Sequence, residues 1–417
     1  MNPPASDTDR TDANGATAAT PASTPIAEAS APRGAGEIGL VLPGGGARAA
    51  YQVGVLRGIA ELSPAGMPTP FRVIAGTSAG AINAAMIASH AHDFATGVRE
   101  LERLWSEIRS EQVFRTGPLV ALRTSMRWMM AIVSGKLKGN KPMTLLDNAP
   151  LRELLDNNID FLRLRRAISS GNLRALSITA SGYTSARSIS FFDGADDLVA
   201  WHRMRRLGEA VAMNVDHIMA SVALPVIFPA VRIGREFFGD GSLRQMAPLS
   251  PVLHLGADKI LVIASRNEDP NRLPETGTSV PYPSLGQIAG YLLDTLFMDS
   301  IYADHERLER INHTIRRLHE PPSSEQPLHH VESLIITPSA DIREIAQRHK
   351  DEFPASVRML LNRVGGMNRS SSQLLSYLLF ESGYCSELIE LGLRDARAQS
   401  DALRAFLQAP TPATRAQ

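Results

Sequence analysis

The stretch FRVIAGTSAGAINAAMI, residues 71–87, constrains the fold more than any other part of the chain. A short apolar run is followed by the motif GTSAG and then by an alanine-rich segment that favours helix. This pattern predicts a buried strand, a sharp turn and a helix, with Ser78 at the junction. The glycines Gly76 and Gly80 permit such a turn and leave the serine oxygen exposed at a helix N-terminus, as in a nucleophile elbow. The alternative is a helix-capping serine in an ordinary glycine-rich turn.

A second strand, loop and helix precede this stretch, in IGLVLPGGGARAAYQVGVLRGIAEL from Ile38. The helix is expected over residues 47–62. Gly44, Gly46 and Ala49 also fit the turn that binds dinucleotides, but that fold needs an acidic residue at the end of the next strand, which here ends in AGTS. Because the glycines free the backbone amides, the loop is better suited to holding an oxyanion.

Farther along the chain, residues 173–192 predict two strands around a turn, followed by a helix ending near Ala223. The segment AVRIGREFFGDGS predicts a hairpin whose second strand ends at Asp240. Residues 259–265 and 333–337 predict buried strands, separated by a long helix near residues 285–318.

Four motifs, in this order, resemble those of the patatin-like phospholipase family: GGGAR at residues 44–48, GTSAG at 76–80, ASVALPVIFPAV at 220–231 and GDGS at 239–242. The resemblance covers about residues 38–336. It implies an α/β fold of three layers (α/β/α) with a mostly parallel central sheet. It also implies a dyad without histidine, in which Ser78 is the nucleophile and Asp240 the base.

The same resemblance assigns roles to the loop residues. The backbone amides of Gly45 and Gly46, with Gly44 or Ala47, are expected to hold the oxyanion. Arg48 is expected to anchor the loop or to attract a lipid phosphate, with an exposed arginine at a helix start as the alternative. Gly76, Gly80 and Gly241 are the motif glycines. Two positions depart from the family pattern, Ala49 and Ser242, and both carry small residues.

A conventional triad of serine, aspartate and histidine is the main chemical alternative. His254 lies among apolar residues in PVLHLGA and is expected to be a packed helix residue. No histidine after Asp240 stands in a glycine-flanked loop just beyond a predicted strand, where a triad histidine normally lies. No cluster has metal-ligand spacing, so we expect neither a metal nor a cofactor, and activity that persists in excess chelator.

Composition narrows the class of protein. The chain has 43 basic and 43 acidic residues, and a nucleic-acid binder would normally carry a basic excess. Its one cysteine, Cys385, excludes an internal disulfide, and the N-terminus has no apolar signal segment. These features suggest a cytoplasmic protein that visits membranes.

The chain is expected to divide as follows: a disordered N-terminal tail (1–36), a catalytic domain (37–337), a helical C-terminal extension (338–407) and a disordered tail (408–417). Within the catalytic domain, residues 112–146 contain six basic residues, no acidic residue and many apolar ones. This segment is interpreted either as a cap over the core or as a peripheral membrane contact.

Together these features predict a lipid acyl hydrolase that cleaves carboxylic esters of phospholipids through an acyl-serine intermediate, as a phospholipase A, lysophospholipase or esterase. The alternative is a hydrolase fold of weak or no activity that acts as a lipid-binding or regulatory module. Ala49 and Ser242 are the sequence support for that alternative.

Overall fold

A ten-stranded mixed sheet forms the centre of the protein, in the order β10-β9-β1-β2-β3-β4-β6-β5, with β8 paired to β3 and β7 to β8. The computed structural model describes residues 36–115, 144–266, 282–297, 299–317, 329–363, 365–368 and 371–408. The strands are β1 (Ile38–Leu42), β2 (Val73–Thr77), β3 (Ala175–Gly182), β4 (Ser188–Gly194), β5 (Trp201–Arg203), β6 (Arg206–Ala210), β7 (Val231–Ile233), β8 (Glu236–Asp240), β9 (Lys259–Ile263) and β10 (Glu332–Ile336).

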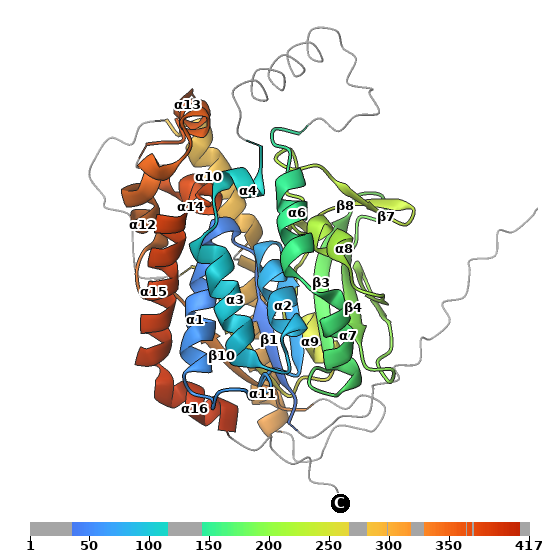
Figure 1. Cartoon of the computed structure of the whole chain (residues 1–417). Helices are drawn as coiled ribbons and strands as arrows, with labels where there is room; N and C mark the ends of the chain where they lie inside the picture. The colour runs from blue at the N-terminus through green and yellow to red at the C-terminus, as the bar shows by residue number, and fades with distance from the viewer. Residues whose placement is uncertain are drawn as a thin grey trace, which may run out of the picture. The chain divides into compact units, whose positions relative to one another are not determined.

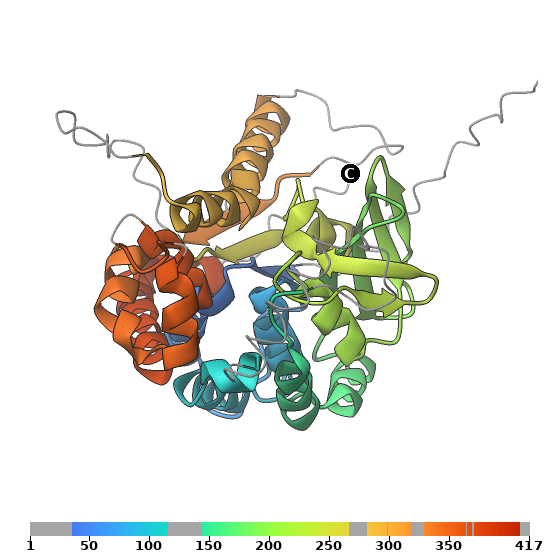
Figure 2. The same cartoon turned by 90° about the horizontal axis from the view of Figure 1, so that it is seen from above.

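Helices cover both faces of this sheet (Figures 1 and 2). They are η1 (Gly46–Ala49), α1 (Ala50–Ala60), α2 (Ala79–Ser89), α3 (Phe94–Ser106), α4 (Ser110–Val113), α6 (Ala149–Asn158), α7 (Phe161–Ser169), α8 (Val215–Ser221), η2 (Gly241–Leu243), α9 (Ser250–His254), α10 (Leu285–Phe297), α11 (Asp299–Arg317), α12 (Ile342–His349), η3 (Lys350–Glu352), α13 (Ala355–Arg363), α14 (Ser372–Leu378), α15 (Ser382–Ala398) and α16 (Ser400–Gln408).

The strands β10, β9, β1, β2 and β3 run parallel, whereas β4 and β8 pair with β3 in the antiparallel sense. Strands of this kind are buried on both faces and therefore read as continuous apolar runs. Along β1, Leu40 and Leu42 belong to the larger core under α1 and α2, while Val41 belongs to a second core under α9 and α11. The predicted three-layer fold with a mostly parallel sheet is confirmed.

The C-terminal helices pack directly on the layer that contains α1. Helix α15 lies along α1, and the two backbones approach so closely that a Cβ built on Gly54 would lie 1.9 Å from the carbonyl oxygen of Ile389. Leu388 and Ile389 of α15 belong to the same core cluster as Leu56 of α1. The predicted helical extension is therefore continuous in packing with the α/β layers.

Two details differ from the sequence-based expectation. The long helix expected near residues 285–318 is two helices, α10 and α11. The strands β5 and β6 were not predicted, because residues 201–210 are rich in arginine and lie at the edge of the sheet, where half-exposed strands lack a continuous apolar run.

Three predicted segments fall largely outside the described residues: the N-terminal tail before residue 36, the part of the 112–146 segment at 116–143, and the tail after residue 408. Among the helices that are described, none is both long and apolar enough to cross a bilayer.

Candidate active site

Strand register brings Ser78 and Asp240 together along one edge of β3, where β2 and β8 follow each other while β4 occupies the other edge. In the parallel pair of β2 and β3, Thr77 lies beside Thr179, so the next residues along the two strands are Ser78 and Ala180. In the antiparallel pair of β3 and β8, Ala180 lies opposite Asp240. The residues are 162 positions apart in sequence, yet the Oγ of Ser78 donates a hydrogen bond of 2.6 Å to the Oδ2 of Asp240.

Ser78 occupies a strained turn between β2 and α2. Its φ of 52° and ψ of −130° lie in a region that residues with a side chain rarely adopt. The turn is held because α2 begins against the end of β1, where a Cβ on Gly80 would lie 2.0 Å from the carbonyl oxygen of Leu42. The Ser78 amide also donates to the Oγ of Ser221 (2.8 Å), whose hydroxyl donates to the carbonyl oxygen of Thr179 (2.6 Å).

The environment of Asp240 favours its neutral form. Burial raises the pKa of Asp240 from 3.8 to about 6, although hydrogen bonds from Ser78 and from the amide and side chain of Ser242 act in the opposite direction. The amide of Ser242 donates to the Oδ1 of Asp240 at 2.9 Å. Among the described residues no cation pairs with this carboxylate. It can therefore accept a proton near neutral pH, as a general base must.

The loop of three glycines lies at the end of β1, the strand that has β2 on one side and β9 on the other. The strand order reverses there, and ligands of open α/β sheets bind at such points. Gly46 lines the same cavity as Ser78 and Asp240. In the part of the chain that the structure describes, the amides of Gly45 and Gly46 donate no hydrogen bond, as expected at the start of a helical turn.

Arg48 is buried, contrary to the alternative of an exposed arginine. Its guanidinium donates from Nε to the Oγ of Ser376 (2.9 Å) and from Nη1 to Asp294 (3.2 Å) and to the hydroxyl of Tyr377 (3.1 Å). The guanidinium also stacks over the Tyr377 ring, 3.8 Å from its centroid. Asp294 is shared, because Arg266 pairs with its other oxygen. These contacts join the glycine loop to α10 and α14.

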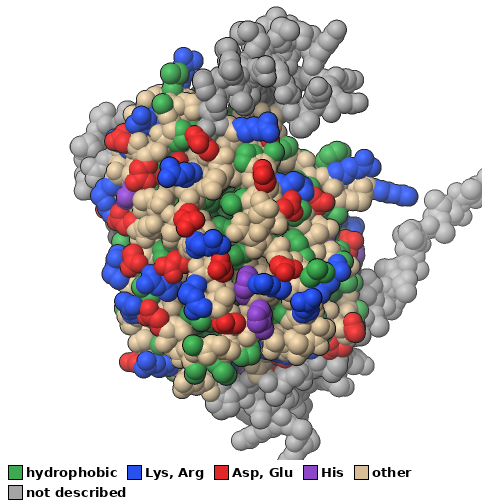
Figure 3. Space-filling model, in the orientation of Figure 1, with side chains coloured by type: hydrophobic (Ala, Val, Ile, Leu, Met, Phe, Trp, Pro, Cys, Tyr) green, Lys and Arg blue, Asp and Glu red, His purple; other side chains and the backbone are tan. Residues whose placement is uncertain are grey.

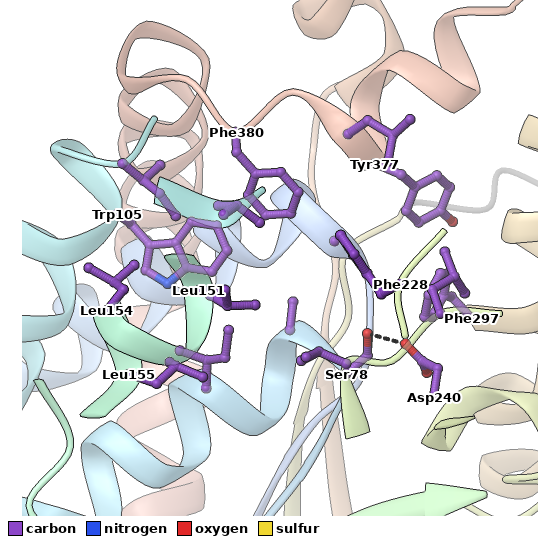
Figure 4. A pocket seen from close by; sticks show the side chains of 18 of the residues that line it. Ser78, Trp105, Leu151, Leu154, Leu155, Phe228, Asp240, Phe297, Tyr377 and Phe380 are labelled. Carbon is purple, nitrogen blue, oxygen red and sulfur yellow. Dashed lines mark hydrogen bonds between the residues drawn. The ribbon is translucent and has the colours of Figure 1, made fainter. Parts of the chain in front are cut away.

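A narrow cavity extends from the dyad between α3, α6 and the C-terminal helices. Ser78 and Asp240 lie at one side of it, and Trp105, Leu154 and Leu155 at the other (Figure 4). The remaining lining is almost entirely apolar, including side chains of α10 and α14. Its volume is about 50 Å³, room for only a few water molecules. The shape and lining suit an alkyl chain, which would have to displace side chains on entry.

The alternatives raised by the sequence lie elsewhere in the fold. His254 stacks on Trp201, with ring centroids 4.8 Å apart, and its Nδ1 lies 2.8 Å from the carbonyl oxygen of Ser250. No histidine of the described residues lines the cavity. Among the same residues, no group of three histidine, cysteine, aspartate or glutamate side chains could hold a metal ion.

The two departures from the family pattern occupy tight positions. Ala49 is fully buried, and its carbonyl oxygen accepts a hydrogen bond of 3.1 Å from Asn83. The hydroxyl of Ser242 lies close to Gly44, where a Cβ built on that glycine would be 2.9 Å away.

Sequence reasoning did not identify Ser221, Asp294 or Tyr377. Ser221 lies within the recognised segment at residues 220–231, but nothing in that pattern indicated its hydrogen bond to the Ser78 amide. Asp294 is the only charged residue in the apolar helix LGQIAGYLLDTLF, and an isolated acid in such a helix indicates a buried partner. Tyr377 is 329 residues from Arg48 and had no detectable signal.

Comparison with known protein families decides the classification. The family model described as patatin-like phospholipase matches residues 40–253. The chain belongs to the patatin-like phospholipase family. Membership supports lipid acyl hydrolase activity and a lipid substrate. The matched residues include the glycine loop, Ser78 and Asp240, and they end before α10, which supplies Asp294.

Two further comparisons add little. Comparison with curated proteins gave no match. Among solved structures, human GIVD cytosolic phospholipase A2 in complex with methyl gamma-linolenyl fluorophosphonate is similar at 12% sequence identity and a TM-score of 0.37. The alignment covers 90% of this chain and 59% of that chain.

Proposed function

We propose that the protein hydrolyses carboxylic esters of lipids, with Ser78 as nucleophile and Asp240 as the only base. The observation that carries this proposal is the 2.6 Å hydrogen bond from the Ser78 hydroxyl to a buried carboxylate that pairs with no cation among the described residues. A carboxylate in this position is suited to take the hydroxyl proton as the oxygen attacks.

In the first step the Ser78 oxygen bonds to the carbonyl carbon of the ester while Asp240 takes the hydroxyl proton. The carbonyl oxygen becomes negative, and the free amides of Gly45 and Gly46 donate to it. The intermediate then expels the alcohol, which takes the proton from Asp240, and the acyl group remains on Ser78. In the second step water attacks the acyl-serine, Asp240 takes the water proton, and the carboxylic acid leaves as Ser78 regains its hydrogen.

The cavity supports a long-chain acyl group as the part of the substrate that enters. The described residues that line it include no cation for a head group, and Arg48 is already engaged with Asp294, Ser376 and Tyr377. We therefore assign Arg48 to anchoring the loop rather than to binding a lipid phosphate. Phospholipase A, lysophospholipase and simple esterase activities all fit this arrangement.

Mass-spectrometric analysis of products from a panel of phospholipids, lysophospholipids and neutral esters tests the proposal. The wild-type protein is expected to release free fatty acid from at least one of these, and Ser78→Ala to release none above the uncatalysed rate. Asp240→Ala is expected to lose activity to a similar degree, because serine without a base is a weak nucleophile. A folded wild-type protein that binds these lipids and cleaves none would instead be a lipid-binding or regulatory module.

A further inference from the structure

Helix α10 has two apolar faces, and only one of them is packed. On the inner face Leu293 and Phe297 line the cavity. On the outer face Leu285 is 70% exposed, Tyr291 68% and Leu292 57%. Large apolar side chains gathered on one helix face are unusual on a protein surface and mark contact with something apolar.

The exposed face continues onto the neighbouring segments. Tyr282, just before α10, is 92% exposed, and Met359 and Leu360 of α13 are exposed as well. The turn after α13 touches the start of α10, where a Cβ built on Gly286 would lie 2.6 Å from the Cα of Gly366. We call the exposed apolar side chains of these segments the α10–α13 face. They are Tyr282, Leu285, Ile288, Tyr291, Leu292, Met359 and Leu360.

The charges of the α10–α13 face indicate what covers it. Residues 282–293 contain no charged side chain, and Asp294, the only charge on α10, is buried. The charges of α13 are two arginines, Arg358 and Arg363, and Arg358 lies 3.8 Å from the carboxylate of Asp351 in η3. Figure 3 shows hydrophobic and basic side chains together at the upper end of the molecule, over α13, whereas both signs of charge are interspersed over the body.

A bilayer surface matches this chemistry. Interfacial helices bury an apolar face at the boundary between head groups and acyl chains, tyrosine prefers that depth, and arginine is attracted to anionic lipid. Tyrosine and arginine are also enriched where proteins meet, so the choice between a bilayer and a second copy depends on the cavity that the inner face of α10 lines.

We propose that the α10–α13 face rests on the surface of a phospholipid bilayer. The choice of a lipid surface rests on the proposed function, because the inner face of α10 walls the cavity that would receive an acyl chain. The same helix would thus contact the membrane on one side and the substrate on the other. The face lies outside the residues that match the family.

Co-sedimentation of the full chain with vesicles tests this proposal. Vesicles of dialkyl-ether phosphatidylcholine, with or without dialkyl-ether phosphatidylserine, have no ester bond in their tails and therefore resist hydrolysis. The triple variant Leu285→Gln, Tyr291→Gln, Leu292→Gln is expected to partition at least about tenfold more weakly, because it loses the apolar contact. The matched control is Leu162→Gln, on α7, where the side chain is 64% exposed; it is expected to bind like the wild type.

The arginines provide an independent arm. Arg358→Gln with Arg363→Gln is expected to weaken binding several-fold to vesicles that contain the anionic lipid, and to leave binding to neutral vesicles unchanged. Tyr291→Gln alone, which disturbs the fold least, is expected to weaken binding about threefold to both kinds of vesicle. Circular dichroism confirms that each variant is folded.

The proposal is overturned if the wild-type protein does not bind the vesicles, or if the triple variant binds as well as Leu162→Gln. It is also overturned if the triple variant converts a dimer to a monomer in sedimentation velocity without changing vesicle binding, since the face would then cover a second copy. Hydrolysis of a water-soluble short-chain ester separates the two proposals. Absence of hydrolysis in the wild type with normal vesicle binding would contradict the proposed function alone.

Discussion

The two halves of the molecule place their buried aspartates in opposite environments. In the α/β part, Asp240 is surrounded by hydroxyl and amide donors, and burial raises the pKa of its carboxyl to about 6. In the helical part, Asp294 lies between the guanidinium groups of Arg48 and Arg266 and accepts from Tyr377. A carboxylate without a cation can exchange a proton, whereas one paired with two arginines serves as an anchor.

The two parts of the fold therefore contribute differently to the site. Residues 36–266 hold the proposed nucleophile and base, and contacts from α10 and α14 fix the glycine loop. A Cβ on Gly46 would lie 2.2 Å from the carbonyl oxygen of Tyr377, so the loop and α14 are in direct contact. The helical region is therefore expected to affect catalysis without touching the substrate ester.

The largest expected effect concerns the pH dependence set by Asp240. Because the base must be ionised, kcat/KM is expected to fall about tenfold for each pH unit below about 6 and to be level above it until another group titrates. Hydrolysis of a soluble ester between pH 4 and 8 measures the profile. An unchanged rate at pH 4 would show that Asp240 is not the base.

The next effect concerns Asp294. Asp294→Asn leaves the Arg48 charge incompletely paired and shifts the glycine loop, so kcat is expected to fall roughly tenfold or more while KM changes little. The pH profile set by Asp240 should keep its midpoint. Active-site titration corrects each kcat for any loss of folded protein.

Asp304 offers the matched control for that substitution. It is also a buried aspartate, on α11, and accepts from the amide of Leu249 at 3.0 Å. Asp304→Asn is expected to leave kcat within about twofold, since Asp304 contacts neither the loop nor the cavity. Equal losses in the two variants would mean that Asp294 acts only through overall stability.

Asp240 is also expected to cost stability. The unfolded chain loses this proton near pH 3.8 and the folded chain near 6. Stability is therefore lost as pH rises through this window, and at neutral pH the cost is up to about 3 kcal/mol. Asp240→Asn should raise the free energy of unfolding at pH 7, with the gain vanishing below pH 4. Denaturant unfolding at the two pH values measures it, and a loss of stability at pH 7 would contradict this account.

The smallest expected effect lies at the surface of the helical region. Although burial acts against the charged form, contacts of His349 with Glu352 (2.5 Å) and Glu387 (2.6 Å) raise its pKa. The stabilising contribution of His349 is complete below the ordinary histidine pKa and is lost as pH rises through the raised pKa. His349→Gln should thus destabilise the protein at pH 6 and have little effect at pH 9. A destabilisation that is the same at both pH values would assign the role of His349 to packing.

The sequence predicted the catalytic half far better than the helical half, for a physical reason. Ser78, Asp240 and the glycine loop lie in short motifs because a tight turn beside a strand end needs small residues at fixed spacing. The register that joins Ser78 to Asp240 through Ala180 was not predicted, because it pairs strands that are far apart in the sequence.

The Arg48 anchor could not be predicted in the same way. Its partners come from two helices more than 240 residues away, and a buried pair of charges has no local pattern. The lone acid of α10 is a signal from which a buried partner of Asp294 could have been inferred, but it does not identify Arg48. The exposed apolar face of α10 could not be predicted from the sequence either, because the helix is apolar on both sides and only packing determines which side is exposed.

The most direct test of the central claim is mass spectrometry of the intact folded protein after reaction with a fluorophosphonate ester. The account predicts one adduct, located on Ser78 by peptide mapping, that forms much more slowly in Asp240→Asn and below pH 5. A folded wild-type protein that forms no adduct, or forms it on another residue, would contradict the assignment of Ser78 and Asp240 as the catalytic pair.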